Sequence, residues 1–590
     1  MTNNRLTAKV MGLAKSVLPF FLFILLPLSV SAQISKNVTV DAVGQLSKQI
    51  QNDEKFKISE LKISGSLNSA DIKLLQQIVC RSKANEKKGE CLVTSVDISE
   101  AVFTEGKDAK ATNKLPNGLF AGAKQLLKVS LPEGITNISK SCFNSCAALP
   151  DIHIPESVTA IENQAFDGCE SLASISIPKN VTTIGDEAFE DCTALTSVEI
   201  PENVNDLGSQ VFNGCKALTS INIVGDIKKI NSATFKGCEA LTSVTFPESV
   251  KYIGSDAFRD CKSLERIDLP ENVEEIGNSA FEDCDNLRSI EMTKVGKIGS
   301  NAFEDCKSLD AVTLDQISKL GSGVFKNCSA LSSVSLQGSL SEINSNTFLG
   351  CTSLNSISIP TTVKSIGSSA FEKCRSLADI DLPTALTKIG DDAFLECSSL
   401  RQVIIPNLVK SLGNSAFEGC SSLDSVVVNG FIPEIESKTF YKCNALRTIS
   451  LPNTIKKIGT KAFQECTALR SIELPVALTS IGDDAFEKCS SLESIKIPIA
   501  VTSIGDDAFL ECTMLSKAEL PVSLKKIGGS AFAKCPSLRD VILNCPTPPV
   551  IAKSTFKDVV SCSFWLPKNS KTLYMANKDW VKVYVLKEKE

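Results

Sequence analysis

The chain has 590 residues, of which 22% are charged, and a formal net charge of −6 at pH 7. This mild acidity is dispersed and no basic patch is visible, which disfavours nucleic acid as a partner. The single histidine, and the lack of a phosphate-binding glycine loop or a Ser-His-Asp set, argue against an enzyme, and no cofactor or metal is predicted.

Residues 1–32 have the pattern of a cleavable secretory signal. Basic side chains precede an apolar run over residues 17–28, and small residues at 30–32 suit cleavage before Gln33. A signal anchor is the alternative, but the run is short for a bilayer span and no second membrane segment follows. We therefore expect a secreted or cell-surface protein with no integral membrane span after signal removal.

Residues 33–114 lack the repeat that follows and are predicted to form an N-terminal cap. Residues 61–68 have the pattern of a strand and a turn, and residues 70–80 have that of a helix. Cys80 and Cys91 could form a disulfide in this cap, since the expected compartment is oxidising.

A ladder of phenylalanines dominates residues 115–545 and ends just beyond them. Twenty phenylalanines follow one another at intervals of 22 to 24 residues, and sixteen of the nineteen intervals are 23. They are Phe120, Phe143, Phe166, Phe189, Phe212, Phe235, Phe258, Phe281, Phe303, Phe325, Phe348, Phe371, Phe394, Phe417, Phe440, Phe463, Phe486, Phe509, Phe532 and Phe556. Such a repeat is typical of a leucine-rich-repeat solenoid, in which each coil buries its apolar side chains against its neighbours. We expect about 18 coils with a cap at each end.

Each coil is predicted to contain a short strand. In the coil that contains Leu195, Val198 and Ile200, the spacing L-x-x-L-x-L places the last two side chains on one face of the strand. Pro201 follows, and its missing N–H should end the strand. Stacked coils would pair these strands into a curved parallel β-sheet on the concave side of the solenoid.

The segment that carries each phenylalanine is predicted to form a one-turn helix or a 3₁₀ turn on the convex side. Three residues before the Phe stands Ser, Thr, Asp or Asn in sixteen of the seventeen coils from Phe166 to Phe532, and Gly529 is the exception. Such side chains cap free N–H groups at a helix start. The Phe itself should fill the convex side of the core.

The 23 cysteines include a column of eighteen that stand three residues after a ladder Phe, from Cys146 to Cys535. Side chains in such a column point in parallel, which is a poor geometry for disulfides and for tetrahedral metal binding. We expect buried thiols that pack as small apolar side chains.

Residues 546–590 differ in composition from the repeats and are predicted to form a C-terminal cap. This segment holds both tryptophans of the chain, Trp565 and Trp580. The alternative is an aromatic platform on which sugar rings would stack.

The repeat L-x-x-I-x-I-P-x-x-V-x-x-I-G-x-x-A-F-x-x-C, with Leu at some of its Ile and Val positions, is seen at residues 377–397 and 469–489. It resembles the BspA-like bacterial leucine-rich repeat family over roughly residues 115–556. The resemblance implies a surface protein that binds host matrix proteins, host cells or other bacteria. It supplies no universal binding residue to carry over.

The strand face is the predicted binding surface, because a row of strands offers a long and rigid platform. Most of its outward positions are small and polar, so they could bind an extended partner or simply be solvated. Ile404 and Val427 are apolar outward positions in adjacent coils, close to a loop with Phe431, and charged residues flank them. An exposed apolar patch of this kind is typical of a protein contact, although β-branched residues also occur on strands by chance. The predicted partner-binding residues are Ile404, Val427, Phe431, Arg401, Asp424 and Arg447.

Other chemistry finds little support in the sequence. His153 falls at an outward strand position, which favours a solvated side chain over a catalyst. Acidic pairs such as Asp391 and Asp392 could suggest Ca²⁺, but the first of each pair stands at the capping position. A host or bacterial surface protein is therefore the expected partner. A glycan ligand and an architectural or self-associating role are the alternatives.

Overall fold

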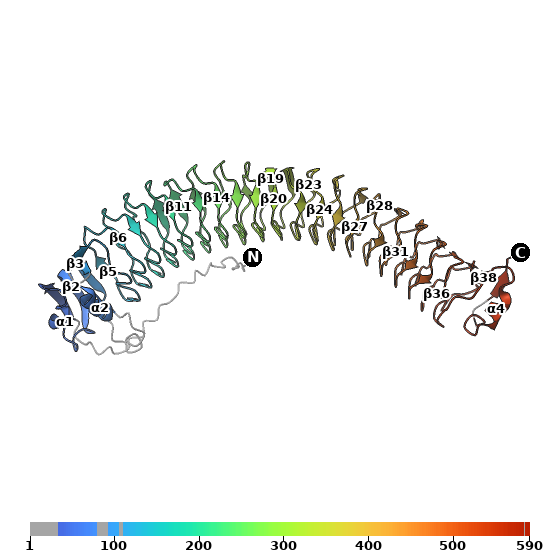
Figure 1. Cartoon of the computed structure of the whole chain (residues 1–590), viewed down its shortest axis with the longest axis horizontal. Helices are drawn as coiled ribbons and strands as arrows, with labels where there is room; N and C mark the ends of the chain where they lie inside the picture. Colours follow the sequence, from blue (N-terminus) through green and yellow to red (C-terminus); the bar gives the residue numbers. More distant parts are fainter. Residues whose placement is uncertain (1–33, 80–91, 106–109, 583–584, 590) are drawn as a thin grey trace, which may run out of the picture.

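The protein is one long stack of coils along an arch. The computed structural model describes residues 34–79, 92–105, 110–582 and 585–589. Figure 1 shows the coils side by side from the N-terminal sheet to the C-terminal helix. The predicted solenoid with coils of about 23 residues is confirmed. The predicted signal segment and the pairing of Cys80 with Cys91 lie outside the described residues.

The N-terminal segment forms a sheet that continues into the first coils. Its elements are β1 (Ile34–Val40), α1 (Leu46–Gln49), β2 (Ile58–Leu67), α2 (Ser69–Ile78), β3 (Ser95–Glu105), β4 (Lys110–Thr112) and β5 (Lys128–Ser130). The strand order is β1-β2-β3-β4, and β5 pairs with β3 in parallel. Asn68 caps α2, and the buried Asp71 carboxylate accepts hydrogen bonds from the N–H groups of Gly44 (2.6 Å), Leu46 (2.9 Å) and Asn68 (3.1 Å). These bonds tie α2 to α1, because one carboxylate satisfies free N–H groups of both segments.

Two columns of parallel strands run along the solenoid. The front strands follow the Leu column and begin the predicted strand face. They are β9 (Ser197–Ile200), β11 (Ser220–Ile223), β13 (Ser243–Thr245), β15 (Arg266–Ile267), β17 (Ser289–Ile290), β19 (Ala311–Ile317), β21 (Ser333–Gly338), β23 (Ser356–Ser358), β26 (Gln402–Ile405), β28 (Ser425–Val428), β30 (Thr448–Ser450), β33 (Ser494–Lys496), β35 (Lys517–Leu520) and β37 (Asp540–Leu543). We call their outward surface the front face.

The side strands are two residues long and precede the ladder Phe. They are β6 (Asn137–Ile138), β7 (Ala160–Ile161), β8 (Thr183–Ile184), β10 (Asp206–Leu207), β12 (Lys229–Ile230), β14 (Tyr252–Ile253), β16 (Glu275–Ile276), β18 (Lys297–Ile298), β20 (Lys319–Leu320), β22 (Glu342–Ile343), β24 (Ser365–Ile366), β25 (Lys388–Ile389), β27 (Ser411–Leu412), β29 (Glu434–Ile435), β31 (Lys457–Ile458), β32 (Ser480–Ile481), β34 (Ser503–Ile504) and β36 (Lys526–Ile527). Paired side strands match residue for residue from one coil to the next, for example Thr183 with Asp206.

Proline sets the length of the front ladder, as its missing N–H predicts. Where another residue takes its place, one more bond forms: Val224 N donates to Ile200 O (2.9 Å) and Asn429 N donates to Ile405 O (3.0 Å). Asn544 N likewise donates to Leu520 O (3.0 Å). Coils without Pro therefore carry the longer front strands.

The phenylalanine ladder is a continuous stack. All nineteen neighbouring pairs of ladder rings are stacked, with centroids 5.1–5.8 Å apart. The rings are buried along its whole length. Each coil thus covers the ring of its neighbour, and no coil buries its own Phe alone.

The segment around each ladder Phe, which we call the turn edge, consists of hydrogen-bonded turns and not of the expected helix. Cys169 N donates to Phe166 O (3.1 Å), an i to i+3 bond of the kind that a 3₁₀ turn makes. Gln164 and Gly168 have φ values of 58° and 70°, and this left-handed backbone prevents a right-handed helix from continuing.

The residues predicted to cap these helices act between coils instead. The Asp186 carboxylate accepts a hydrogen bond from Ser209 N of the next coil (2.8 Å), and Asp391 accepts one from Asn414 N (2.7 Å). The prediction that these side chains satisfy backbone N–H groups holds, but their partners lie one coil further along the chain.

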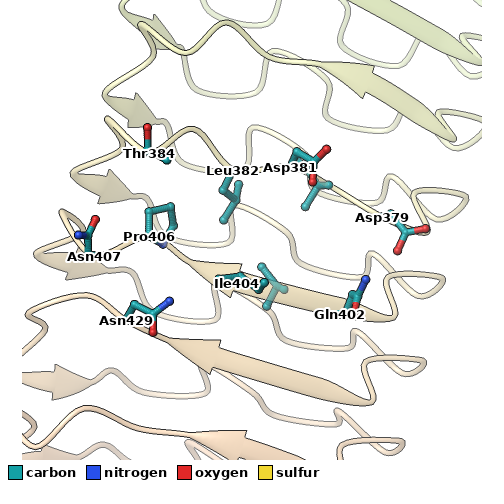
Figure 2. Close-up of a pocket in the computed structure, with 11 residues that line it drawn as sticks. Asp379, Asp381, Leu382, Thr384, Gln402, Ile404, Pro406, Asn407 and Asn429 are labelled. Carbon is teal, nitrogen blue, oxygen red and sulfur yellow. The ribbon is translucent and has the colours of Figure 1, made fainter.

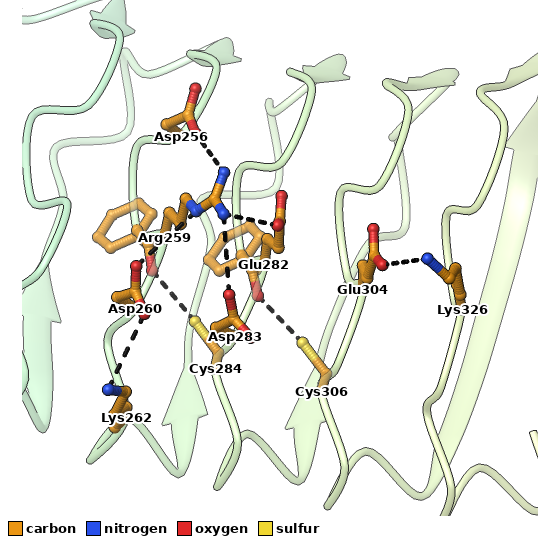
Figure 3. A network of polar contacts seen from close by, with 12 residues as sticks. Asp256, Arg259, Asp260, Lys262, Glu282, Asp283, Cys284, Glu304, Cys306 and Lys326 are labelled. Carbon is orange, nitrogen blue, oxygen red and sulfur yellow. Dashed lines mark hydrogen bonds and ion pairs between the residues drawn. The ribbon is translucent and has the colours of Figure 1, made fainter. Parts of the chain in front are cut away.

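The cysteine column lies beside the ladder as free, buried thiols, which confirms the packing prediction. Each of the eighteen thiols also donates to the carbonyl of the ladder Phe one coil earlier, at 3.0–3.3 Å. Figure 3 shows two of these bonds, from Cys284 and Cys306. Burial raises the pKa of both thiols, so the neutral S–H donor persists.

Three seams interrupt the side ladder. Among the described strands, β10 does not pair with β12, β20 does not pair with β22, and β27 does not pair with β29. Ladder rings are also furthest apart there, at 5.8, 5.6 and 5.7 Å. The seams divide the solenoid into blocks of four or five side strands.

A side chain takes the place of glycine at each seam. In ordinary coils Gly413 N donates to Ile389 O (3.0 Å), and a Cβ on Gly413 would lie 2.4 Å from backbone atoms of the previous coil. At the first two seams Asn231 and Asn344 stand at this position, and their amide groups donate to the carbonyls of Leu207 and Leu320 (2.5 Å each). Glu436 stands at the third. The wider gap therefore admits a side chain, which replaces the lost backbone bond.

Aromatic side chains cover the last coil. The elements are β38 (Ser563–Leu566), α4 (Lys571–Ala576) and β39 (Val585–Glu588), and both strands extend the front ladder in parallel. Trp580 is fully buried, lies edge-on against Phe564 and Tyr574, and donates to Pro549 O (2.8 Å). The sugar platform is therefore wrong for Trp580. Within the described ranges, no helix has the length and apolar character needed to cross a bilayer.

Candidate functional site

The front face is hollowed around Ile404. The hollow has a volume of about 630 Å³ and is lined by residues of three coils. Figure 2 shows Ile404 between Gln402 and Pro406 along β26, with Asp381 of the previous coil beside it. Asn429 of the following coil closes one corner.

Ile404 is the apolar centre of this hollow. Its side chain is 60% exposed, although Val403 and Ile405 on either side of it are buried, because alternate strand residues point to opposite faces. Val427 lies opposite Ile404 in the β26–β28 register and is 37% exposed. Burying such side chains against a partner would be favourable by roughly 25 cal/mol per Å² of apolar area.

Two carboxylates give the hollow a negative rim. Asp379 and Asp381 are exposed and line it, and within the described part of the chain neither has an ion-pair partner. Neighbouring coils instead pair their charges across the coil boundary, as Arg447 does with Asp424 (3.1 Å). The two free carboxylates therefore favour a partner with basic side chains.

A second hollow of about 630 Å³ adjoins the first and shares Asp379 and Gln402 with it. Arg401, Asp424 and Arg447 line this second hollow. The ion pair between Asp424 and Arg447 is exposed and contributes little to stability, so both groups remain accessible to a partner.

The structure brings together four of the six predicted partner-binding residues. Ile404 lines the first hollow, and Arg401, Asp424 and Arg447 line the second. Val427 and Phe431 are exposed beside them, and Phe431 is 69% exposed, but neither lines a hollow. The assignment of the six residues to partner binding stays a prediction.

Sequence reasoning missed a second apolar site, which we call the apolar row. Val476, Ile499 and Val522 follow Pro475, Pro498 and Pro521 in three successive coils, and they are 66%, 70% and 50% exposed. They line a hollow of about 660 Å³ on the front face. The sequence carried a signal for it, because the residue after Pro is polar or charged in other coils, as at Glu202, Glu248, Glu271, Thr361, Thr384, Asn407 and Asn453.

The turn edge carries charge networks that differ along the solenoid. Figure 3 shows Arg259 reaching the carboxylates of Asp256, Asp260, Glu282 and Asp283. The shortest of these contacts is 2.8 Å, to Glu282 of the next coil. This arginine therefore compensates acidic groups from two coils at once.

The turn edge nearer the N-terminus has acidic groups without such a cation. Burial, with Asp191 and Glu187 close by, raises the pKa of Asp167 to about 6. Burial also raises the pKa of Glu190. Asn144 and Asn213 donate hydrogen bonds to these two carboxylates (2.6 Å each), but an amide cannot compensate their charge.

Little in the described residues suggests a catalyst. His153 is exposed on the surface, and its only close charged neighbour is Glu133 at 3.9 Å. No group of three or more His, Cys, Asp or Glu side chains is placed to hold a metal ion in the part of the chain that the structure describes. The first Asp of each acidic pair is occupied by a backbone N–H of the next coil, as at Asp483 with Asp506 N (2.8 Å).

The family follows from the repeat. The model of the BspA-type leucine-rich repeat region, which contains six copies of the repeat, matches residues 113–242, 228–352, 318–447 and 433–563. The chain belongs to this family. None of the curated proteins matches it.

Solved structures of bacterial leucine-rich repeat proteins are similar to this BspA-type chain. A leucine-rich repeat protein from Bacteroides ovatus is 27% identical, with 75% of this chain and 92% of that chain covered and a TM-score of 0.44. A leucine-rich cell surface protein from Faecalibacterium prausnitzii is 26% identical, with 58% and 86% covered and a TM-score of 0.30.

Proposed function

We propose that this BspA-type protein is exported to the cell surface, where it binds another protein through the front face around Ile404. The partner would be a host matrix protein, a host cell protein or a protein of another bacterium. It would place an apolar side chain on Ile404 and basic side chains beside Asp379 and Asp381. The hydrophobic, well-exposed centre of a rigid hollow is the observation that carries this proposal.

The rigidity of the front face supports binding over catalysis. The strands that carry the hollow are held on both sides by ladder bonds and by the ring stack beneath them. A preorganised surface loses little conformational entropy when a partner binds. Export is supported by the signal pattern at residues 1–32 and by the cell-surface description of one similar structure.

The test is capture of partners on residues 33–590 from host matrix and serum, followed by mass spectrometry, with the double variant Ile404→Ser and Val427→Ser beside it. Because both side chains are exposed, the variant should keep its circular dichroism spectrum and unfolding curve. We expect the captured partner to bind the variant roughly tenfold more weakly or worse. Equal binding by both proteins would show that the hollow is not the binding site.

A matched control is Val224→Ser, which removes an exposed apolar side chain far from the hollow. This variant should bind the partner as the unchanged protein does. Loss of binding in the control as well would point to a general surface effect.

A further inference from the structure

The apolar row is a continuous exposed stripe that runs across three coils. Val476, Ile499 and Val522 occupy the same position in each coil, 23 residues apart. The stripe lies in its own hollow, together with parts of Leu474, Ile497 and Pro521. It ends at Asn544, whose amide oxygen accepts a hydrogen bond from Lys589 Nζ (2.6 Å).

A row of alternating charges lies next to the apolar row. Glu473, Lys496 and Glu519 line the same hollow, and Lys496 is the register partner of Glu519 on the neighbouring strand. Within the described residues, none of the three side chains is in an ion pair, although coils elsewhere pair such charges, as Lys457 and Glu434 do at the side strands. The hollow therefore offers the sequence negative, positive, negative to whatever lies on the stripe.

The coil spacing matches the pitch of an α-helix. The ladder rings of these coils are 5.2, 5.2 and 5.1 Å apart. One turn of a helix rises about 5.4 Å, so side chains at i, i+4 and i+7 of a helix lying along the solenoid would each meet one coil. An extended strand repeats its side chains every 6.6–6.8 Å or so, which falls out of step with the coils.

We infer that the apolar row is a docking groove for an amphipathic helix of a partner protein. The helix lies across the coils with apolar side chains at i, i+4 and i+7 on Val476, Ile499 and Val522. Beside this stripe it carries Lys or Arg opposite Glu473 and Glu519, and Glu or Asp opposite Lys496. This inference extends the proposed protein-binding function to a second site, and it rests on the apolar row and its charges, not on the hollow around Ile404.

The test is selection from a displayed library of helical hairpins, randomised on one face, against residues 33–590. The triple variant Val476→Ser, Ile499→Ser and Val522→Ser serves as the counter-target. We expect selected helices to share the apolar stripe and the basic, acidic, basic flank. Their Kd should rise by about tenfold or more on the triple variant, as for the loss of interface anchors.

A charge swap tests the orientation of the helix. Lys496→Glu should weaken a selected helix that carries Glu at the central flank, and changing that helix residue to Lys should restore binding. Helices that bind the triple variant equally well, or selected sequences without the stripe, would overturn the inference. So would light scattering that shows a dimer which only the triple variant dissociates, because a second copy would then cover the row.

The outcome is separable from that of the proposed function. Ile404→Ser with Val427→Ser should leave the selected helices bound as before, since those residues lie outside the helix groove. Failure of host protein capture would therefore not affect the helix result. Loss of helix binding in that variant would count against two independent sites.

Discussion

The hollow around Ile404 and the apolar row occupy the same place in two blocks of the solenoid, 115 residues apart. Asn429 closes the first and Asn544 closes the second, and each Asn stands where other coils have Pro. Equivalent positions have opposite character, because Asp381 in the first corresponds to Lys496 in the second. One hollow is acidic with a single apolar centre, and the other is an apolar stripe with mixed charges.

This difference teaches that the two blocks share a backbone but not a surface. Thr384 and Asn407 of the first become Ile499 and Val522 of the second, while the buried Phe and Cys columns are unchanged between them. The interior should therefore set stability and the front face should set binding. Four changes break or sharpen this division, in order of expected effect on the free energy of unfolding.

The largest effect should come from a ladder ring. Phe417→Ala leaves a cavity between two stacked neighbours and should lower the free energy of unfolding of the solenoid by about 3–5 kcal/mol. Phe431→Ala is the matched control, since this ring is 69% exposed in the adjacent coil, and it should change stability by less than about 0.5 kcal/mol. Urea unfolding of both variants measures the contrast, and similar losses would contradict the division.

The next effect should come from close coil contact. Gly413→Ala would place a Cβ 2.4 Å from backbone atoms of the previous coil, so the coils must move apart at a cost of about 1–3 kcal/mol. Gly134→Ala, where a Cβ meets nothing within 4 Å, should be neutral or slightly stabilising. If thermal unfolding gave both variants the same midpoint, the coils would be more loosely stacked than described.

A smaller effect is expected in the cysteine column. Cys420→Ala removes the thiol that donates to Phe394 O (3.2 Å) and should cost about 1–2 kcal/mol. Burial raises the pKa of the Cys420 thiol, so the thiolate should be scarce and the native residue should resist alkylation at pH 8. Mass spectrometry after iodoacetamide treatment, with and without denaturant, checks this. Rapid native labelling of Cys420 would contradict it.

The smallest effect should come from the turn edge near the N-terminus. The pKa of Asp167 is raised from its usual 3.8 to about 6, so the folded chain holds this proton more tightly than the unfolded chain. Its protonation stabilises the fold fully below pH about 4, and this stabilisation is lost as the pH rises through about 6. Asp167→Asn should therefore stabilise at pH 7 by up to about 1 kcal/mol, after allowance for solvent screening, and change little at pH 4.

Unfolding curves at several pH values measure this difference. Glu248→Gln, at an exposed position outside the turn edge, is the control and should show no such pH dependence. An Asp167 variant that destabilises equally at both pH values would show that hydrogen bonding to Asn144 outweighs the unfavourable charge.

The sequence predicts the interior of this protein well, because each buried column repeats one residue type. Phe, Leu and Cys recur at fixed spacing, and a parallel stack is the arrangement that buries them all. The role of Pro201 in ending the front ladder follows from its missing N–H. The helix around each Phe was not correct, because left-handed residues such as Gln164 belong to types that sequence alone does not restrict to that conformation.

The front face is less predictable, because its residues are not constrained by packing. Ile404 could be found as a departure from a polar pattern at the strand positions. Val476, Ile499 and Val522 were missed because they lie after the Pro, outside the two positions that strand alternation marks as outward. The seams were missed as well, since Asn231 in place of Gly looks like an ordinary substitution until its amide is seen to replace a ladder bond.

The stacked rings also make the solenoid a molecular ruler. Five coils at ring spacings of 5.2–5.7 Å place the two hollows about 27 Å apart along the arch. A single partner that engages both needs a rigid body of that length or a linker of at least about eight extended residues. Its avidity would then depend on linker length, and deleting one coil would shift the optimum by a single step of the stack.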